Sequence, residues 1–145
     1  MSEPTRESEP LVPSDERLVS MLADARTIAV VGLSSKRGRP SHRVAAYLKA
    51  KGYRIIPVNP GETRVLGETS YPSLLDVPEK IDVVDVFRRA EYTPEAARQA
   101  VAVGAKILWL QEGIVNGEAG RIAADGGLEV VMGACMMRTH ERLAG

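Results

Sequence analysis

The chain has 145 residues, of which 44% are hydrophobic and 26% charged, a composition typical of one globular domain. Nineteen Lys and Arg residues balance nineteen Asp and Glu residues, and the net charge of zero argues against a nucleic-acid or membrane-surface binder. The single cysteine, Cys135, excludes an internal disulfide and a Cys-rich zinc site. The first 13 residues are acidic and contain three prolines, which predicts a disordered tail over 1–13.

The first half of the chain alternates between helical and strand-like patterns. Ser14 and the two acids after it predict the start of a helix. The apolar run 27–31 predicts a strand that is buried on both faces of a parallel sheet. Ser41 is the expected N-cap of a second helix that ends at Gly52. The run 55–58 predicts the next strand, although Pro57 is awkward inside a central strand.

The second half continues the alternation. Residues 59–80 are rich in loop-forming residues, with one helical turn near Leu74, and 81–87 predicts a third strand. Thr93 and Pro94 open a helix that ends at Gly104, before a fourth strand over 107–110. A helix over 116–125, a strand over 128–132 and a helix over 134–143 complete the pattern.

This alternation predicts an α/β fold: a Rossmann-like, doubly wound, five-stranded parallel sheet in a single domain over 14–145. No apolar run reaches the about 18 residues of a membrane span, and no apolar segment of a signal peptide opens the chain. We therefore expect a cytoplasmic protein with no membrane partner. Ligands of such sheets bind beyond the carboxyl ends of the strands. The segments that follow the strands are 32–41, 59–61, 87–89, 111–113 and 133–137.

The first of these segments carries the clearest chemical signal. The strand 27–31 leads into GLSSKRGRPS at 32–41 and then into a helix. A glycine lets backbone N–H groups approach a phosphate, and a helix N-terminus adds free donors and partial positive charge. Serine hydroxyls and the cations Lys36 and Arg39 strengthen that interaction, whereas capping a helix needs only one serine. The segment therefore predicts a phosphate-binding turn.

The type of phosphate ligand follows from what the turn lacks. It matches neither G-x-G-x-x-G nor the Walker pattern. An NAD site also needs a carboxylate at the end of the second strand, but residues 25–61 contain no acid. A carboxylate there would repel a ribose phosphate, so its absence favours NADP or coenzyme A (CoA) over NAD.

Six motifs in order then point to a family. They are VGLSSKRGRPSH at 31–42, PVNPG at 57–61, LGETSYPSL at 66–74, DVVDVFRR at 82–89, WLQEG at 109–113 and VMGACMM at 131–137. This set resembles the small stand-alone CoA-binding proteins. Those proteins are similar to the nucleotide-binding domain of the succinyl-CoA synthetase α subunit and of ADP-forming acyl-CoA synthetases.

The resemblance implies the cofactor, CoA, and a set of residues that bind it. In the matching positions, the turn after the first strand would hold the CoA phosphates, the turn after the second strand would lie beside it, and Phe87 with its neighbours would lie near the adenine. The implied residues are Gly32, Ser34, Ser35, Lys36, Arg39, Pro40, Ser41, Asn59, Pro60, Phe87, Arg88, Arg89 and Gln111. The chain departs from the synthetase at Glu62, where the synthetase has a lysine that assists CoA binding.

We therefore predict a module that binds CoA or an acyl-CoA and carries no catalytic residues of its own. One alternative is an NADP-binding domain of the oxidoreductase type, although 145 residues leave no room for a substrate domain. Another is a regulatory subunit that senses acyl-CoA and docks on a larger acyl-CoA enzyme.

The remaining candidate residues give weaker signals. Cys135 lies among methionines, a setting typical of a buried and unreactive thiol. His42 lies in the first turn after the phosphate-binding segment, and His140 is predicted to be at the surface. Asp85 is unusual within an apolar strand, and we expect it to pair with a lysine or to cap a helix. No His and carboxylate cluster has the spacing of metal ligands, so no metal is predicted.

Overall fold

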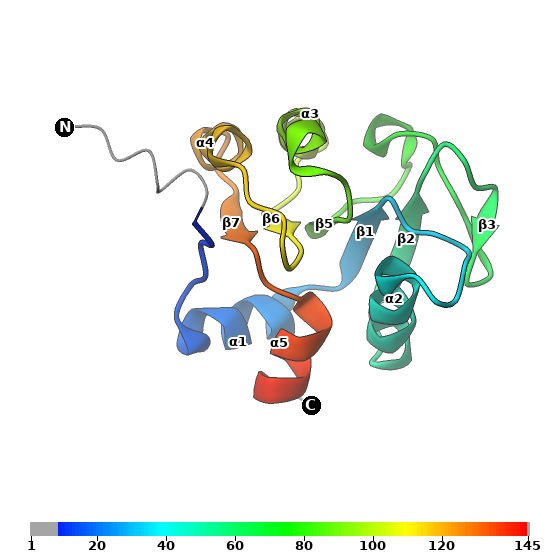
Figure 1. Ribbon diagram of the computed structural model, residues 1–145, viewed down its shortest axis with the longest axis horizontal. Helices are drawn as coiled ribbons and strands as arrows, with labels where there is room; N and C mark the ends of the chain where they lie inside the picture. The colour runs from blue at the N-terminus through cyan, green and yellow to red at the C-terminus, as the bar shows by residue number, and fades with distance from the viewer. Residues whose placement is uncertain (1–8, 145) are drawn as a thin grey trace.

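The computed structural model describes residues 9–144. Five strands, all parallel, form one sheet in the order β2-β1-β5-β6-β7 (Figure 1). They are β1 (Thr27–Val31), β2 (Arg54–Val58), β5 (Val83–Val86), β6 (Ile107–Leu110) and β7 (Glu129–Met132). Apart from the first residue of some strands, their side chains are buried, as expected for a parallel sheet covered on both faces. The predicted fold class is confirmed.

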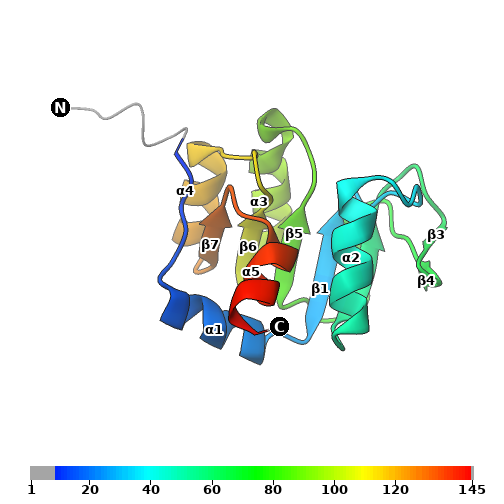
Figure 2. The same ribbon diagram turned by 60° about the horizontal axis from the view of Figure 1, so that its bottom comes forward.

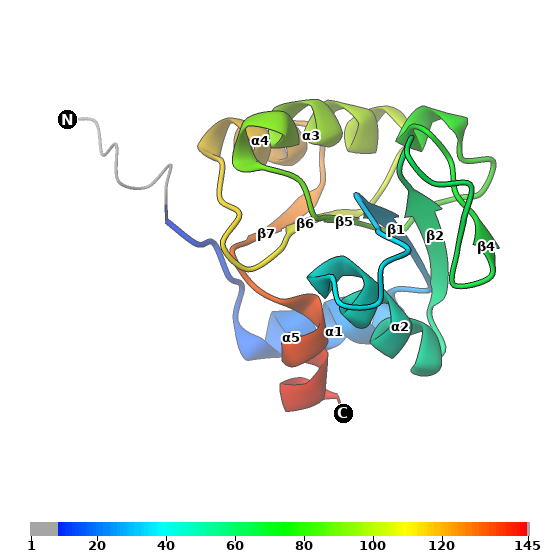
Figure 3. The same ribbon diagram turned by 45° about the vertical axis from the view of Figure 1, so that its right-hand side comes forward.

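Helices cover both faces of the sheet (Figures 2 and 3). One layer contains α3 (Thr93–Ala102) and α4 (Gly117–Asp125). The other contains α1 (Asp15–Asp24), α2 (Pro40–Ala50) and α5 (Met136–Leu143). The core is accordingly split into two apolar clusters, one on each side of the strands. Within residues 9–144 the longest helix has 11 residues, and none is long and apolar enough to cross a membrane.

The position of β2 explains how a proline fits in a strand. β2 is the edge strand of the sheet, and the carbonyl oxygen of Pro57 accepts a hydrogen bond from Tyr71 N at 3.1 Å, on the side away from β1. The N and O atoms of one strand residue point the same way, so the N–H that Pro57 lacks is not needed for pairing with β1.

The segment between β2 and β5 contains elements that the sequence does not predict. β3 (Arg64–Val65) and β4 (Glu68–Thr69) form a short antiparallel hairpin. The 3-10 helix η2 (Leu74–Asp76) follows in the same segment and is the helical turn predicted near Leu74, whereas the 3-10 helix η3 (Ala90–Tyr92) lies after β5. Strands of two residues are too short to show a period in the sequence.

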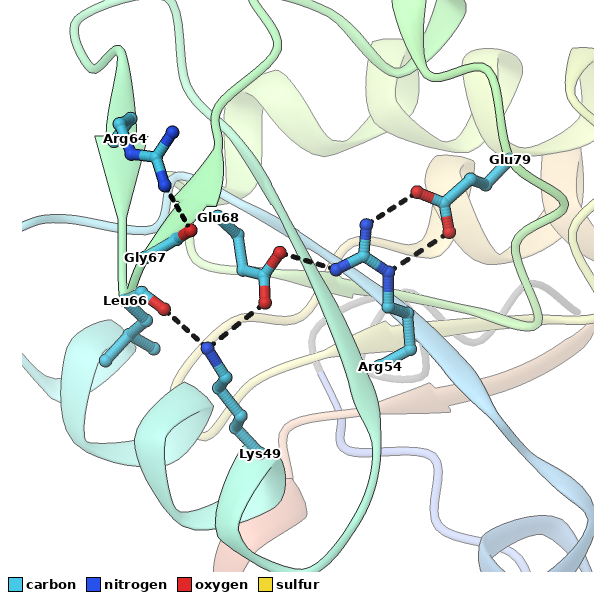
Figure 4. Close-up of polar contacts among 7 residues, drawn as sticks. All are labelled: Lys49, Arg54, Arg64, Leu66, Gly67, Glu68 and Glu79. Atoms are coloured by element: carbon cyan, nitrogen blue, oxygen red, sulfur yellow. Dashed lines mark hydrogen bonds and ion pairs between the residues drawn. The ribbon is translucent and has the colours of Figure 1, made fainter.

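Ion pairs attach this hairpin to the rest of the domain (Figure 4). The carboxylate of Glu68 accepts from Lys49 of α2 at 3.1 Å and from Arg54 of β2 at 2.5 Å. Arg54 also binds Glu79 through two hydrogen bonds, at 3.1 and 2.6 Å. One arginine therefore holds both the hairpin and the later part of the segment, near β5.

Two predicted details at the N-terminal side have different outcomes. Ser14 is the N-cap of α1 and accepts from Arg17 N at 3.2 Å, as predicted. Of the predicted tail, residues 1–8 lie outside the described residues. Leu11 exchanges two backbone hydrogen bonds with Met132, at 3.0 and 2.8 Å, so this part of the segment is paired with the edge of the sheet at β7.

The last helix contains a buried histidine, and the predicted surface position of His140 is wrong. Its side chain is only 7% exposed. His140 Nδ1 lies 2.8 Å from the hydroxyl of Tyr47, and the rings of Tyr47 and Tyr53 contact the imidazole edge-on. Burial and the nearby Lys51 lower the pKa of His140. The neutral imidazole thus fills the contact between α2 and α5.

Candidate functional site

The strand order reverses between β1 and β5, and the chain turns away from the sheet there at two adjacent points. Gly32 follows β1, and Phe87 follows β5. Gly32 has a φ of +87°, and a Cβ atom on it would lie 2.4 Å from the Phe87 carbonyl oxygen. Only glycine satisfies both requirements. A crevice at this reversal is the usual ligand position in such a sheet.

A cavity of about 610 Å³ opens at this place. Its volume lies within the range of about 300–1,000 Å³ that is typical of small-molecule sites. It is bounded by the turn after β1, the first turns of α2, the segments after β5 and β6, and the start of α5. The lining residues are Gly32, Ser34, Arg39, Pro40, Ser41, Arg43, Val44, Phe87, Arg88, Arg89, Gln111, Glu112, Ile114, Cys135, Met137 and Arg138.

Nine of the 13 residues implied by the sequence resemblance line this cavity. They are Gly32, Ser34, Arg39, Pro40, Ser41, Phe87, Arg88, Arg89 and Gln111. Four others do not line it: Ser35, Lys36, Asn59 and Pro60.

Among these four, Asn59 has a structural contact. Its amide Nδ2 donates to Leu33 O at 3.0 Å, and its Oδ1 accepts from Gly61 N at 2.9 Å. Asn59 therefore connects the turn after β2 to the turn after β1 instead of facing the cavity.

The role predicted for Ser41 as an N-cap is wrong. Helix α2 begins at Pro40 with Arg39 at the N-cap, and Ser41 lies inside the first turn. Proline is well suited to the first helical position, because its missing N–H would have no partner there. The Ser41 hydroxyl instead accepts from Ser34 N at 3.1 Å, across the turn after β1.

Arginines dominate the charge around the cavity. Arg39, Arg43, Arg88, Arg89 and Arg138 come from three separate segments of the chain. Arg138 is paired with Glu112 at 2.8 Å, and Arg88 lies over the ring of Tyr92 at 4.9 Å. Within residues 9–144, the other three have no carboxylate partner. Such unneutralised guanidinium groups around one cavity suit a ligand with several negative charges.

Beneath the cavity, Gln111 connects a buried acid to the last helix. Its Nε2 donates to Asp85 Oδ1, and its Oε1 accepts from Met136 N at 3.4 Å. Asp85 is fully buried, and its Oδ2 has no hydrogen-bond partner. Burial raises the pKa of Asp85 to about 7, against the opposing effect of the Gln111 hydrogen bond. The prediction that Asp85 pairs with a lysine or caps a helix is wrong, because the group that contacts it is the neutral amide of Gln111.

Several lining residues were not among those implied by the resemblance. They are Arg43, Val44, Ile114, Cys135, Met137 and Arg138. Arg43 lies one turn of α2 beyond Arg39, so helical spacing brings both to the same side. Arg138 lies one residue past the segment 133–137 that follows the last strand. Cys135 is half-buried at the N-cap of α5 and faces the cavity, in contrast to the expected burial among methionines.

His42 lies beside the cavity turn and contacts its backbone. His42 Nδ1 donates to the Ser34 carbonyl oxygen at 3.0 Å, so this ring supports the shape of the turn. In residues 9–144, no group of three or more His, Cys, Asp or Glu side chains is placed to hold a metal ion.

A doubly wound parallel sheet with an arginine-lined cavity at its reversal point is the architecture of a nucleotide-binding protein. The family model described as "CoA binding domain" matches residues 26–141. The chain belongs to this family of CoA-binding domains, and the resemblance inferred from its motifs is confirmed.

Individual relatives and solved structures are also similar to this chain. The uncharacterized protein YneT of Bacillus subtilis is 38% identical over 88% of this chain and 95% of its own length. The ADP-forming acetate–CoA ligase II of Archaeoglobus fulgidus is 32% identical over 56% of this chain, which corresponds to 12% of the ligase. The structure of a hypothetical protein from Pyrococcus horikoshii is 42% identical, covers 100% of both chains and has a TM-score of 0.91.

Proposed function

We propose that this protein binds CoA or an acyl-CoA in the cavity between β1, β5 and α5. The diphosphate lies at the turn after β1, where Gly32 permits the close approach to the Phe87 backbone and Ser34 and Ser41 supply hydroxyls. The N-terminus of α2 adds its partial positive charge. Arg39, Arg88 and Arg89 neutralise the ribose phosphate, and Phe87 flanks the adenine.

One observation carries the proposal: three cavity arginines, Arg39, Arg43 and Arg89, have no acidic partner within residues 9–144. Cations held close together repel one another, and a polyanion relieves that repulsion. The absence of acids over residues 25–61 is the sequence counterpart of this observation. CoA carries both a diphosphate and a ribose phosphate, and the family supplies the same ligand class.

Titration calorimetry tests the proposal with four ligands: CoA, acetyl-CoA, NADP and NAD. We expect micromolar binding of CoA and no binding of NADP or NAD. Binding of NADP in place of CoA would instead support an oxidoreductase-type domain. Tighter binding of acetyl-CoA than of CoA would support a subunit that senses acyl-CoA beside a larger enzyme, comparable to the ligase that this chain resembles in part.

Substitutions in the cavity locate the site. Arg39→Ala and Arg89→Ala should each weaken CoA binding about tenfold, which corresponds to about 1.4 kcal/mol for one charge-assisted contact. Arg37→Ala is the matched control, because Arg37 belongs to the same turn, is exposed and does not line the cavity. Equal losses for all three variants would indicate a general charge effect and would contradict the assigned site.

A further inference from the structure

The turn after β1 keeps its backbone donors occupied by its own chain. Ser34 N donates to the Ser41 hydroxyl at 3.1 Å, and Lys36 N donates to the Ser34 hydroxyl at 3.1 Å. Between them, Ser35 N donates to Glu62 Oε2 at 2.9 Å. Two of these three acceptors are neutral hydroxyls. The third is a carboxylate, the type of group for which a phosphate would substitute.

Glu62 also affects the charge of the turn. The hydrogen bonds from Ser35 lower the pKa of Glu62, and the positive charge of Lys36 lowers it further. The carboxylate is therefore ionised at neutral pH and lies beside both Ser35 and Lys36. These two residues are the ones from the turn that were expected to bind phosphate and that do not line the cavity.

The backbone around Glu62 is held in place. Glu62 N donates to Asn59 O at 3.2 Å, and Ser70 Oγ donates to the same oxygen at 3.1 Å. Ser70 N donates to Thr63 O at 2.9 Å, which closes the base of the hairpin β3–β4. The ion pairs of Glu68 in Figure 4 fix the far end of that hairpin. Glu62 thus reaches the turn from an anchored segment, and its side chain is the part that can move away.

We propose that Glu62 is an affinity-determining residue that competes with a ligand phosphate for the Ser35 amide. The proposal rests on the proposed CoA function and concerns the same turn. A phosphate that approaches Ser35 N–H meets the negative carboxylate first and must displace it. Once Glu62 moves away, Ser35 N and the Lys36 ammonium become available to the ligand. The chain therefore binds CoA more weakly than the arginines of the cavity alone would allow.

The variant Glu62→Gln separates charge from shape. Its amide oxygen can still accept from Ser35 N, so the turn keeps its conformation, but a phosphate displaces it without charge repulsion. We expect CoA to bind about tenfold more tightly to Glu62→Gln than to the wild type, measured by calorimetry. Glu118→Gln is the matched control, because it removes the same charge at an exposed position in the first turn of α4.

A second ligand and a second measurement sharpen the test. If Glu62→Gln strengthens the binding of dephospho-CoA by the same factor as the binding of CoA, Glu62 competes with the diphosphate. If the variant strengthens only the binding of CoA, Glu62 competes with the ribose phosphate. Either result supports the proposal. In the wild type, the Ser35 amide resonance should also shift when CoA is added, because its acceptor changes from a carboxylate to a phosphate.

The failures of the two proposals can be distinguished. If the wild type binds CoA and Glu62→Gln binds it with equal or lower affinity, the proposed role of Glu62 is overturned, but the proposed CoA function is not. An absence of CoA binding in both proteins, each shown to be folded by its thermal transition, would overturn both.

Discussion

The two ends of the same sheet treat charge in opposite ways. At the amino ends of the strands, three cations face acids: Arg17 binds Glu129, Lys106 lies 3.7 Å from Asp82, and Arg54 binds two glutamates. At the carboxyl ends, arginines gather around a cavity, and three of them have no acidic partner within residues 9–144.

This difference separates charges that are neutralised by a partner within the fold from charges that can interact with an anion from outside. Paired surface charges contribute little to stability, and their positive and negative fields cancel. Unpaired arginines around a cavity raise the local positive potential and favour an anion. Two acids that lie three residues apart show a similar contrast. Asp82, just before β5, lies near Lys106, whereas Asp85, within β5, contacts the neutral amide of Gln111.

The largest expected effect concerns these two acids. Burial raises the pKa of Asp85 to about 7, so stability that is present below the unfolded pKa is lost as the pH rises from about 4 to about 7, by on the order of 4 kcal/mol. Burial also acts on Asp82, but hydrogen bonds from Thr27 N and Arg26 N outweigh it and lower the pKa of Asp82. Its stabilisation is present above the unfolded pKa and is lost as the pH falls through the folded pKa.

Urea unfolding between pH 4 and pH 8 separates the two contributions. Asp85→Asn should abolish the loss of stability that the wild type shows as the pH rises. The stability of this variant relative to the wild type should therefore increase with pH. Asp82→Asn should instead show a constant deficit over this range, because the stabilisation from its ionised carboxylate is already present above the unfolded pKa and is lost only at lower pH. Parallel pH profiles for the wild type and Asp85→Asn would contradict the account of the buried acid.

The next largest effect is expected for alanine substitutions at two glycines, one at each end of the strands. Gly32 at the carboxyl end and Gly104 at the amino end both have a positive φ, +87° and +74°. A Cβ on Gly32 would lie 2.4 Å from a carbonyl oxygen, whereas nothing lies within 4 Å of a Cβ on Gly104. Gly104→Ala should cost about 1 kcal/mol, from backbone conformation alone, and Gly32→Ala about 3 kcal/mol or more. Equal losses in denaturant unfolding would show that the turn after β1 relaxes freely.

The smallest effect is expected from the paired charges at the amino ends. Glu129→Gln breaks the exposed pair with Arg17 and should reduce the free energy of unfolding by less than about 1 kcal/mol. The same variant should leave CoA affinity unchanged, because Glu129 lies at the opposite end of the sheet from the cavity. A change in CoA affinity would show that the two ends are not independent.

Much of this arrangement can be predicted from the sequence. Strand–helix alternation specifies the layers, and the rule that ligands bind beyond the carboxyl strand ends selects the segments that line the cavity. The hairpin β3–β4 is not predicted, because two-residue strands show no period. Contacts between distant segments also escape prediction: the Tyr47 side chain that buries His140 lies 93 residues away along the chain.

Cavity lining is harder to predict than the position of the cavity. Ser35 and Lys36 belong to a turn that lines the cavity, but their side of it faces Glu62. A sequence motif identifies the turn as a whole, and the direction of each side chain depends on φ and ψ values that a motif does not specify. Arg138 lines the cavity from the first turn of α5, which begins four residues after β7 ends, and the strand pattern alone does not specify this position.

A crystal structure with CoA tests the central claim most directly. We predict the diphosphate between Gly32 and the first turn of α2, with guanidinium groups of Arg39 or Arg89 within hydrogen-bond distance of the ribose phosphate. CoA bound at the amino ends of the strands, or a diphosphate that lies away from the turn after β1, would contradict this prediction.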